Sequence, residues 1–435
     1  MKEHRTLYME IYDYFKEIIE NGFLKEGEKL PSIRACSLEK NVSKTTVEQA
    51  YMCLCDDGYI LPKSQSGYYV AHRLHVENNN SVVKENRVKT NEIKYDFASS
   101  GVDAESFNMD IWRRYVKSAL RHSDELLFYG ESQGEYELRC EIAKYASKTR
   151  NCVCNENNIV IGAGVGTLLS ILCPLIKNQK TVAFEDLSYK QGITIFKDYG
   201  YSVTTDKKNS NILYVSPSYS SNCGDTMNIG ERFQLTEYAN KNHKLIIEDD
   251  YGSEFRYFNR PTPSLQSLSG GENVVYLGTF SKLLLPSIRI SFMILPKSLT
   301  EEYEKRKDLY NQTVSKVDQI ALCSYIRDGN LNSQIRKSKK LYAQKSKNLE
   351  EILKEEFKNN IEIIKTDSPL FVRCNIKCEM STDEFIERAL DNGIALIKGG
   401  NCENSAEIAF SVSSVPIEKF KEAAKIIKKL AKVSY

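Results

Sequence analysis

The residues with the clearest chemical potential lie at the ends of two β-rich segments. The segment LIIEDDY (245–251) contains Asp249 and Tyr251, and an extended backbone directs side chains two positions apart to the same side. The ring of pyridoxal phosphate suits such a pair, because a carboxylate keeps the ring nitrogen protonated and a phenol can hydrogen-bond the ring hydroxyl. Taken alone, the pair is equally well explained as two ordinary polar residues at a strand end.

A lysine follows the next such segment. The run VVYLGTF (274–280) leads into Ser281 and Lys282, so we expect Lys282 at the carboxyl end of a strand, where open α/β sheets bind ligands. A lysine there can form a Schiff base with an aldehyde cofactor, which is the catalytic role expected of Lys282. Thr279, Ser281 and Arg289 would bind the phosphate of that cofactor. A lone lysine after a strand is usually a surface residue, and only the combination with Asp249 and Tyr251 favours a cofactor site.

A glycine-rich turn offers a second phosphate contact. The stretch GAGVGT (162–167) separates the β-rich NIVI from the apolar run LLSILCPLI, which predicts a strand, a turn and the start of a helix. Backbone amides at Gly164, Val165 and Gly166 would then face an anion. The spacing matches neither a dinucleotide fingerprint nor a P-loop, so the turn alone is a weak signal.

Residues 1–72 are predicted to form a winged helix-turn-helix. Apolar residues over 7–21 recur at helical spacing, Pro31-Ser32 begins a second helix, and Ser43 precedes a third helix that starts at Lys44. The β-rich runs 59–61 and 67–70 predict a hairpin. In such a domain the second helix of the helix-turn-helix, here the one that starts at Lys44, contacts base edges and phosphates of double-stranded DNA. The expected DNA contacts are Arg34, Ser43, Lys44, Thr45, Thr46 and, at the wing, Gly67.

The rest of the chain predicts a linker and a large α/β domain. Apolar residues are sparse over 73–95, and from 96 to 435 short apolar runs alternate with helical stretches, which is typical of a mostly parallel sheet between helices. A net charge of +2 excludes a strongly basic protein. The 12 cysteines lack zinc-site spacing, so no metal is expected. No long apolar run or leader peptide is evident, which predicts a cytoplasmic protein without a membrane partner.

Several motifs resemble one known family in order along the chain. The segment 7–60 contains LPSIR and SKTTVEQAY and is closed by SGYYV, and it resembles the DNA-binding domain of the GntR family. YGESQGEYELRCEIAKYASKTR, FEDLSYKQG, IIEDDYGSEFRY and YLGTFSKLLLPSIR are similar to the aminotransferase-like domain of its MocR subfamily. The resemblance implies a fold-type-I aminotransferase-like domain, with a small C-terminal α+β subdomain, that binds pyridoxal phosphate and a small-molecule effector.

The resemblance also implies individual roles. Lys282 would carry the cofactor, Asp249 and Tyr251 would bind its ring, and Arg289 its phosphate. Tyr189 would stack on the ring. Tyr129 would reach the phosphate of the neighbouring subunit's cofactor, so a head-to-tail homodimer is implied.

The chain departs from the family near its carboxyl end. Where amino-acid-responsive members have an arginine that binds the ligand's carboxylate, this chain has Glu407, and Asn222 and Cys223 replace the usual proline and threonine in another loop. Arg373 could substitute as the cation, although a solvent-facing strand residue is the simpler interpretation. We therefore favour a regulator that senses the cofactor or an amine. A working aminotransferase with a DNA-binding appendage is the alternative, and a domain that has lost the cofactor is disfavoured by Lys282 and Asp249.

Overall fold

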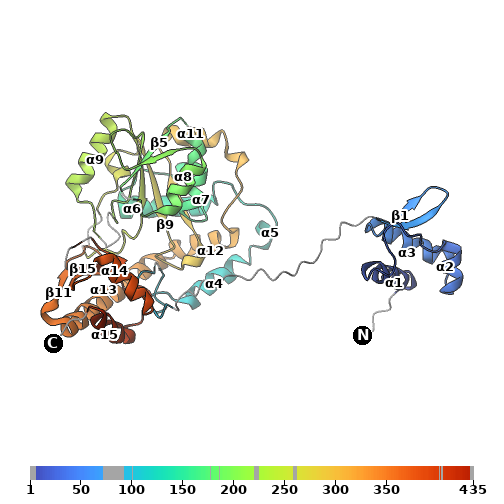
Figure 1. The fold of residues 1–435 in the computed structure, drawn as a ribbon. Helices are drawn as coiled ribbons and strands as arrows, with labels where there is room; N and C mark the ends of the chain where they lie inside the picture. The colour runs from blue at the N-terminus through green and yellow to red at the C-terminus, as the bar shows by residue number, and fades with distance from the viewer. Residues whose placement is uncertain are drawn as a thin grey trace. The chain divides into compact units, whose positions relative to one another are not determined.

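The chain divides into two compact units, with the boundary between Lys89 and Thr90 (Figure 1). The computed structural model describes residues 6–71, 93–99, 101–176, 178–185, 187–219, 225–257, 262–400, 402 and 405–431. Each unit has its own buried apolar core.

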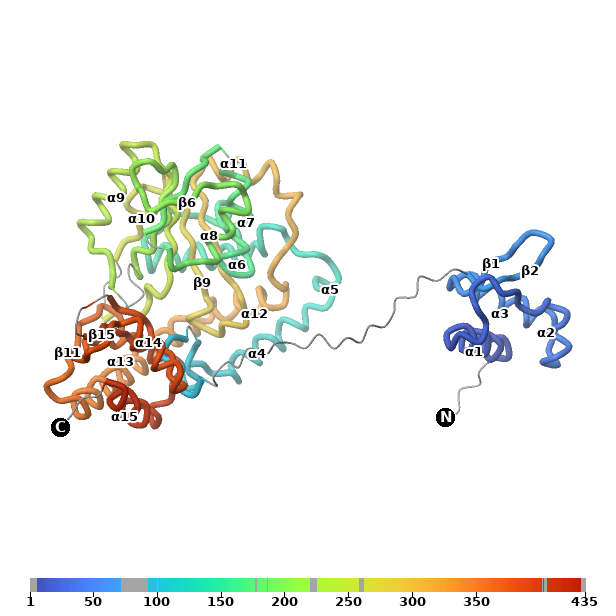
Figure 2. The backbone as a smooth tube through the Cα atoms, viewed as in Figure 1, coloured from blue at the N-terminus to red at the C-terminus, as the bar shows by residue number. Residues whose placement is uncertain are grey.

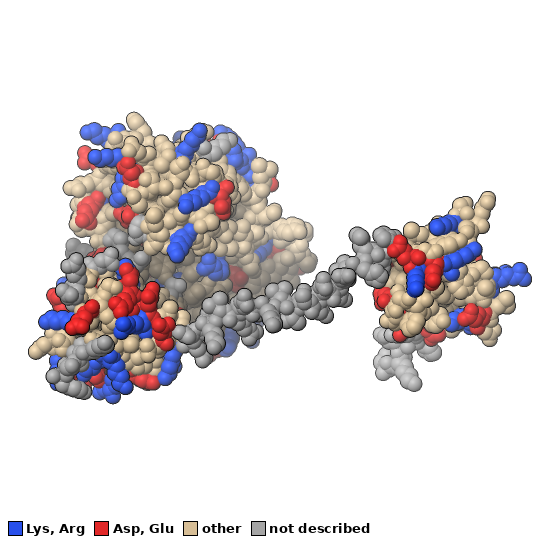
Figure 3. Space-filling model, viewed as in Figure 1, with Lys and Arg blue, Asp and Glu red and all other residues tan. Residues whose placement is uncertain are grey.

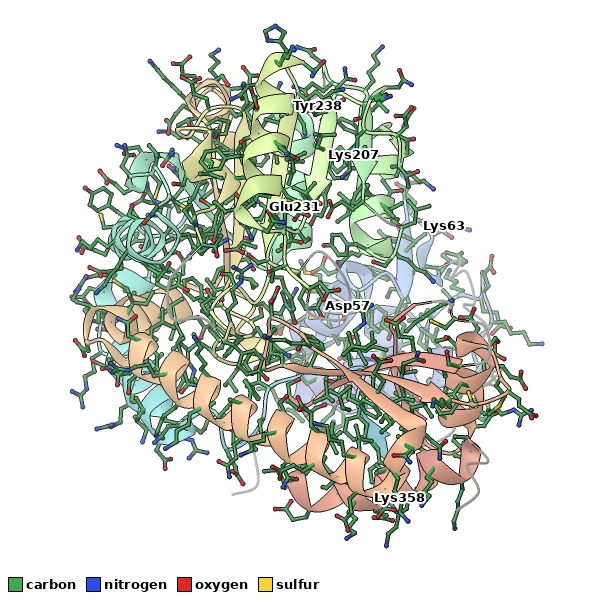
Figure 4. The ribbon with its side chains drawn as sticks, turned by 90° about the vertical axis from the view of Figure 1, so that its left-hand side faces the viewer. Asp57, Lys63, Lys207, Glu231, Tyr238 and Lys358 are labelled. Carbon is green, nitrogen blue, oxygen red and sulfur yellow. The ribbon has the colours of Figure 1, made fainter. Side chains whose placement is uncertain are left out.

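The N-terminal unit is the predicted winged helix-turn-helix. Its elements are α1 (Leu7–Glu20), α2 (Ile33–Glu39), α3 (Lys44–Asp56), β1 (Ile60–Lys63) and β2 (Gly67–Val70). The side chain of Ser32 accepts a hydrogen bond from the Ala35 amide, and Ser43 caps α3 in the same way through Thr46. β1 and β2 pair antiparallel, with Ile60 opposite Val70. Figure 4 labels Asp57, the C-cap residue that follows α3, and Lys63, the last residue of β1.

The second unit contains a seven-stranded sheet. Its spatial order is β4 (Ile159–Gly162), β10 (Ser291–Ile294), β9 (Val274–Thr279), β8 (Leu245–Asp250), β7 (Ile212–Val215), β5 (Thr181–Phe184) and β6 (Ser202–Thr204). Strands β9, β8, β7, β5 and β6 run parallel, whereas β10 is antiparallel to both of its neighbours. The mostly parallel sheet that the sequence predicts is therefore confirmed.

Helices cover both faces of this sheet, which explains why its central strands are apolar on both sides. Buried residues of α7 (Val165–Leu175) and α8 (Lys190–Asp198) share one core cluster with Val275 and Leu277 of β9, whereas α6 (Tyr136–Arg150) shares the opposite cluster with Tyr276. The other helices of this part are α4 (Met109–Ala119), α5 (Ser123–Leu126), α9 (Ile229–Lys241), α10 (Leu265–Leu268), α11 (Lys297–Glu304) and α12 (Lys316–Arg327).

One covering helix, α9, is fixed at both ends by hydrogen bonds. Asn228 and Glu231 form a reciprocal capping box at its start. Further along, the Tyr238 hydroxyl donates a 3.2 Å hydrogen bond to the carbonyl oxygen of Lys207 (Figure 4).

A smaller α+β subdomain completes the second unit (Figure 2). Its antiparallel sheet has the order β11 (Ile361–Ile364), β12 (Phe371–Lys377), β15 (Ser405–Ser411) and β14 (Ile397–Lys398). It packs with α13 (Asn330–Phe357), α14 (Thr382–Asp391) and α15 (Phe420–Leu430). The short β13 (Ile394–Ala395) pairs in parallel with β3 (Tyr95–Asp96). A segment near the start of this unit is thereby hydrogen-bonded to one in its C-terminal part. Among the described residues, none of the helices is long and apolar enough to cross a membrane.

Candidate functional site: a cofactor-type cavity and a DNA-binding surface

A cavity of about 450 Å³ lies at the carboxyl ends of β4, β8 and β9. Every residue predicted to bind the cofactor within one chain lines it, namely Gly164, Val165, Gly166, Tyr189, Asp249, Tyr251, Thr279, Ser281, Lys282 and Arg289. These residues come from five separate segments of the sequence. The structure therefore brings together residues that the sequence related only by type and order.

Asp249 and its tyrosine neighbours form one end of the cavity. The Tyr214 hydroxyl donates a 2.6 Å hydrogen bond to the Asp249 carboxylate, and burial raises the pKa of that carboxyl to about 6. Burial also raises the pKa of Tyr251 to about 12, so its phenol is a neutral donor at physiological pH. A protonated ring nitrogen beside Asp249 would favour the carboxylate form, so the charge of this site matches a pyridinium-type ligand.

Tyr189 lies over the same end of the cavity. Its ring centroid is 5.7 Å from that of Tyr214. A Cβ atom at Gly192 would lie 2.3 Å from a carbon of the Tyr189 ring, so Gly192 permits this position of the ring. A flat ring beside a cavity wall is suited to stacking on an aromatic cofactor.

Lys282 is buried, with only 4% of its surface exposed. Its ammonium group donates hydrogen bonds to the Gly101 carbonyl oxygen at 2.9 Å and to the Ser413 hydroxyl at 3.0 Å. Burial disfavours the charged form and lowers the pKa of Lys282 to about 7. A large neutral fraction near pH 7 is what nucleophilic attack on an aldehyde requires.

Another part of the cavity is built to hold an anion. Gly164 is the N-cap residue of α7. Its φ is +97°, and a Cβ atom placed on it would lie 2.3 Å from an Arg289 guanidinium nitrogen. The buried Ser281 hydroxyl has no hydrogen-bond partner among the described residues. An unpaired buried donor beside helix amides and a guanidinium fits a phosphate, which supplies several acceptor oxygens. The residues present thus fit both the ring and the phosphate of pyridoxal phosphate.

The cavity also contains residues that sequence reasoning missed, including Ser99, Gln191, Tyr219, Phe371, Ile397 and Ser411. Gln191 lies in FEDLSYKQG, one of the segments that are similar to the MocR subfamily, so the sequence could have indicated this residue as a member of the site. Ser99 and Ser411 lie more than 300 positions apart in the sequence and meet through a hydrogen bond from the Ser411 hydroxyl to the Ser99 carbonyl. No local pattern could have related them.

Tyr129 does not line the cavity of its own chain. It is fully exposed and follows the exposed residues Leu127 and Phe128. Its assignment to the cofactor of a neighbouring subunit stays a prediction.

Arg373 and Glu407 form an ion pair rather than facing a ligand or open solvent. The Arg373 side chain is 19% exposed, its Nε lies 2.6 Å from a Glu407 carboxylate oxygen, and its Nη1 lies 2.7 Å from Asp225. Neither Arg373 nor Glu407 lines the cavity. The interpretation of Arg373 as a solvent-facing strand residue is therefore wrong, because two carboxylates cover its charge. Asn222 and Cys223 fall outside the described residues.

The predicted DNA contacts lie on the N-terminal unit. Arg34, Lys44 and Thr45 are exposed, whereas Thr46 is half-buried. The Ser43 hydroxyl is 2.7 Å from the hydroxyls of both Thr45 and Thr46, so these three side chains form one polar cluster at the start of α3.

The wing carries further positive charge. Gly67, with a φ of +108°, lets the chain turn into β2, and Lys63 lies over the Tyr69 ring at 4.4 Å. Figure 3 shows Lys and Arg side chains intermixed with Asp and Glu on the visible face of this unit. That face shows no extended basic patch, so phosphate contacts there would depend on single cations.

Comparison with known proteins supports both units. Residues 7–70 match the model for bacterial regulatory proteins of the gntR family, and residues 93–427 match aminotransferase class I and II. The HTH-type transcriptional regulator YdeL of Bacillus subtilis is 34% identical, with 90% of this chain and 88% of YdeL covered.

More distant relatives include two named regulators, and a solved aminotransferase structure matches a large part of the chain. The probable rhizopine catabolism regulatory protein MocR of Rhizobium meliloti is 26% identical, with 78% and 76% of the two chains covered. PdxR, the pyridoxine biosynthesis regulator of Corynebacterium glutamicum, is 27% identical, with 78% of this chain and 77% of PdxR covered. The multiple substrate aminotransferase of Thermococcus profundus aligns with a TM-score of 0.66 at 25% identity, covering 79% of this chain and 92% of that one.

Proposed function

The chain belongs to the MocR-like subfamily of the GntR regulators, and from this we propose that pyridoxal phosphate, held covalently by Lys282, controls its binding to DNA. The observation that carries the proposal is the buried Lys282, whose pKa is lowered to about 7, in one cavity with Asp249 and the unpaired hydroxyl of Ser281. Each of these groups is costly to bury without a ligand. A ligand with an aldehyde, a basic ring nitrogen and a phosphate would compensate all three.

Each part of the cofactor would contact a different set of residues. Lys282 would bind the aldehyde carbon, while Asp249 and Tyr251 would hold the ring nitrogen and ring hydroxyl. Thr279, Ser281 and Arg289, with the backbone amides of residues 164–166, would bind the phosphate, and Tyr189 would cover the ring. When bound, the cofactor would supply an electron-withdrawing ring and an electrophilic carbon, from which an incoming amine could displace the Lys282 amine.

We propose sensing rather than transamination. Fixing the substrate carboxylate orients the reacting bond in amino-acid transamination. Within the described residues that line the cavity, Lys282 and Arg289 are the only cations, and both have a proposed role toward the cofactor. Arg373 is paired with Glu407 and Asp225. The cofactor itself is therefore our leading effector, and an amine without a carboxylate is the second. The name of PdxR, a regulator of pyridoxine biosynthesis, agrees with the first.

Titration of the apo protein with pyridoxal phosphate tests the proposal. We expect a new absorbance band near the visible edge and an adduct that borohydride reduces, and Lys282→Ala should lose that adduct. Operator affinity should differ by about tenfold between the apo and cofactor-loaded forms, which is a coupling of about 1.4 kcal/mol. A cofactor-loaded protein that binds DNA as the apo form does, but responds to a common amino acid, would contradict the cofactor-sensor reading.

We also propose that the working form is a cytoplasmic head-to-tail homodimer. The exposed run Leu127, Phe128 and Tyr129 is an apolar surface that a second subunit could cover. Tyr129 would then complete the partner's phosphate site. Sedimentation of the full chain tests the dimer, and in Tyr129→Phe dimers cofactor affinity should fall while the dimer persists.

A further inference from the structure

The outward face of α3 has a composition that phosphate binding does not explain. Val47, Ala50, Tyr51 and Leu54 are buried and hold the helix on its core. Lys44, Glu48 and Met52 are exposed at four-residue spacing, so they form one stripe on the exposed side of the helix, beside the exposed Thr45 and Gln49. The stripe carries one cation, one carboxylate and one thioether.

Glu48 is the unexpected member of this stripe. Within residues 6–71, no ion pair involves its carboxylate, whereas Glu39 on α2 lies 3.8 Å from the ammonium group of Lys40. In a helix-turn-helix this helix enters the major groove. An unpaired carboxylate opposite phosphates is repelled, so Glu48 would lower affinity for every sequence unless a hydrogen-bond donor of a base faces it.

The major groove offers few such donors. Guanine presents only acceptors there and thymine presents an acceptor and a methyl group, and both would repel a carboxylate or leave it unpaired. Adenine has an amino group, but its N7 acceptor lies beside that group. Cytosine presents its N4 amino group without an acceptor of its own, so it is the base that best accommodates a carboxylate.

We propose that Glu48 is a specificity-determining residue that accepts a hydrogen bond from a cytosine amino group in the major groove. The inference rests on the proposed DNA-binding function of this unit and adds the identity of one base. Met52 supports base contacts by the same stripe, because 64% of this apolar side chain is exposed there and a thymine methyl group is an apolar contact in the major groove. A stripe built only to bind phosphates would carry cations at these positions.

The experiment selects binding sites for the full-length, cofactor-loaded protein from duplexes with a randomised centre. Wild type, Glu48→Ala, Glu48→Gln and the control Glu10→Gln are compared. Glu10 is an exposed carboxylate on α1, outside the helix-turn-helix pair, so the control removes the same charge without touching α3. Because Glu48 and Glu10 are both exposed, thermal unfolding should be the same for all four proteins.

Wild type and Glu10→Gln should require cytosine at one base pair of each half-site, with replacement by another base weakening binding about tenfold. Glu48→Ala should lose that preference, and Glu48→Gln should move it towards adenine, whose N6 and N7 pair with an amide. Unchanged base preferences in Glu48→Ala, including the case in which all sequences simply bind more tightly, would overturn the inference. Selection of no sequence by the wild type, in any cofactor state, would instead contradict the DNA-binding function itself.

Discussion

The ammonium group of Lys282 donates a 3.0 Å hydrogen bond to the hydroxyl of Ser413, a residue 131 positions later in the chain. The lysine follows β9 of the large sheet, whereas Ser413 follows β15 of the smaller subdomain. The two parts of the second unit therefore meet at the proposed attachment point of the cofactor. A ligand that takes Lys282 away from Ser413 would change the contact between these parts.

The lowered pKa of Lys282 should be visible in the kinetics of cofactor binding. The neutral amine attacks the aldehyde, so the rate of adduct formation with the apo protein should rise from pH 6 to pH 8 and level off with a midpoint near pH 7. An ordinary lysine would continue to accelerate towards its usual pKa of about 10.4. Stopped-flow absorbance measures the profile. Ser413→Ala removes an acceptor that favours the ammonium form, so its midpoint should lie lower; a midpoint above pH 9 in the wild type would contradict the assignment.

The same shift predicts a stability effect in the apo protein. Because the folded-state pKa of Lys282 is lowered to about 7, the unfolded chain binds the proton more tightly, and the resulting penalty on folding is largest below pH 7 and declines as the pH rises towards the unfolded pKa. Lys282→Met should therefore raise the free energy of unfolding of the apo protein at pH 7. At about 1.4 kcal/mol per pKa unit, the gain is at most roughly 5 kcal/mol. Denaturant unfolding at pH 7 and pH 9 should give a smaller gain at pH 9.

Gly164→Ala should damage the phosphate end of the cavity. The new Cβ would lie 2.3 Å from the Arg289 guanidinium, in a residue whose φ is +97°. Gly200→Ala is the matched control, because Gly200 also has a positive φ, +82°, but no atom lies within 4 Å of its Cβ position. Both variants should lose about 1 kcal/mol of stability from backbone strain. Only Gly164→Ala should weaken pyridoxal phosphate binding, by at least tenfold in absorbance titration; equal cofactor affinity in both would exclude this turn from the phosphate site.

Glu407→Gln should make Arg373 available to bind the carboxylate of an added amino acid. The Arg373 guanidinium is bound by Glu407 and Asp225, and removal of one of these two negative charges would leave part of its charge available. The register places Phe371 opposite Ser411 and Arg373 opposite Ala409, and alternation puts Arg373 on the same sheet face as Phe371, which lines the cavity. Amino acids added to the cofactor-loaded variant should change its absorbance at about tenfold lower concentration than in the wild type. The double variant Glu407→Gln/Arg373→Gln should lose this gain, and if it does not, another cation binds the carboxylate.

Lys44→Ala should weaken DNA binding and lower its dependence on salt. If Lys44 neutralises one phosphate, the slope of log affinity against log salt should fall by roughly one unit. Glu48→Ala should not lower that slope, because a carboxylate neutralises no phosphate. Fluorescence anisotropy over a salt series measures both, and an unaltered slope in Lys44→Ala would remove this residue from the phosphate contacts.

The sequence by itself determined the local features of both units. Serines before helical runs predicted the starts of α2 and α3, because an N-cap needs only a side chain and the amides three residues on. Apolar runs predicted the mostly parallel sheet, and the two-residue spacing of Asp249 and Tyr251 predicted that both would face one ligand. These relationships depend on backbone geometry over a few residues, so the order of amino acids is sufficient to reveal them.

Only the tertiary structure decided which distant residues complete the cavity and which charges cancel. Ser99, Ser411 and Ser413 reach the site of Lys282 through the pairing of β3 with β13 and the packing of the smaller sheet. The pairing of β12 with β15 fixes Arg373 beside Glu407, which turned an apparent ligand-binding or solvent-facing arginine into a neutralised one. Such contacts depend on strand register between segments far apart in the chain, and a shift of one residue would turn each side chain to the other face of the sheet.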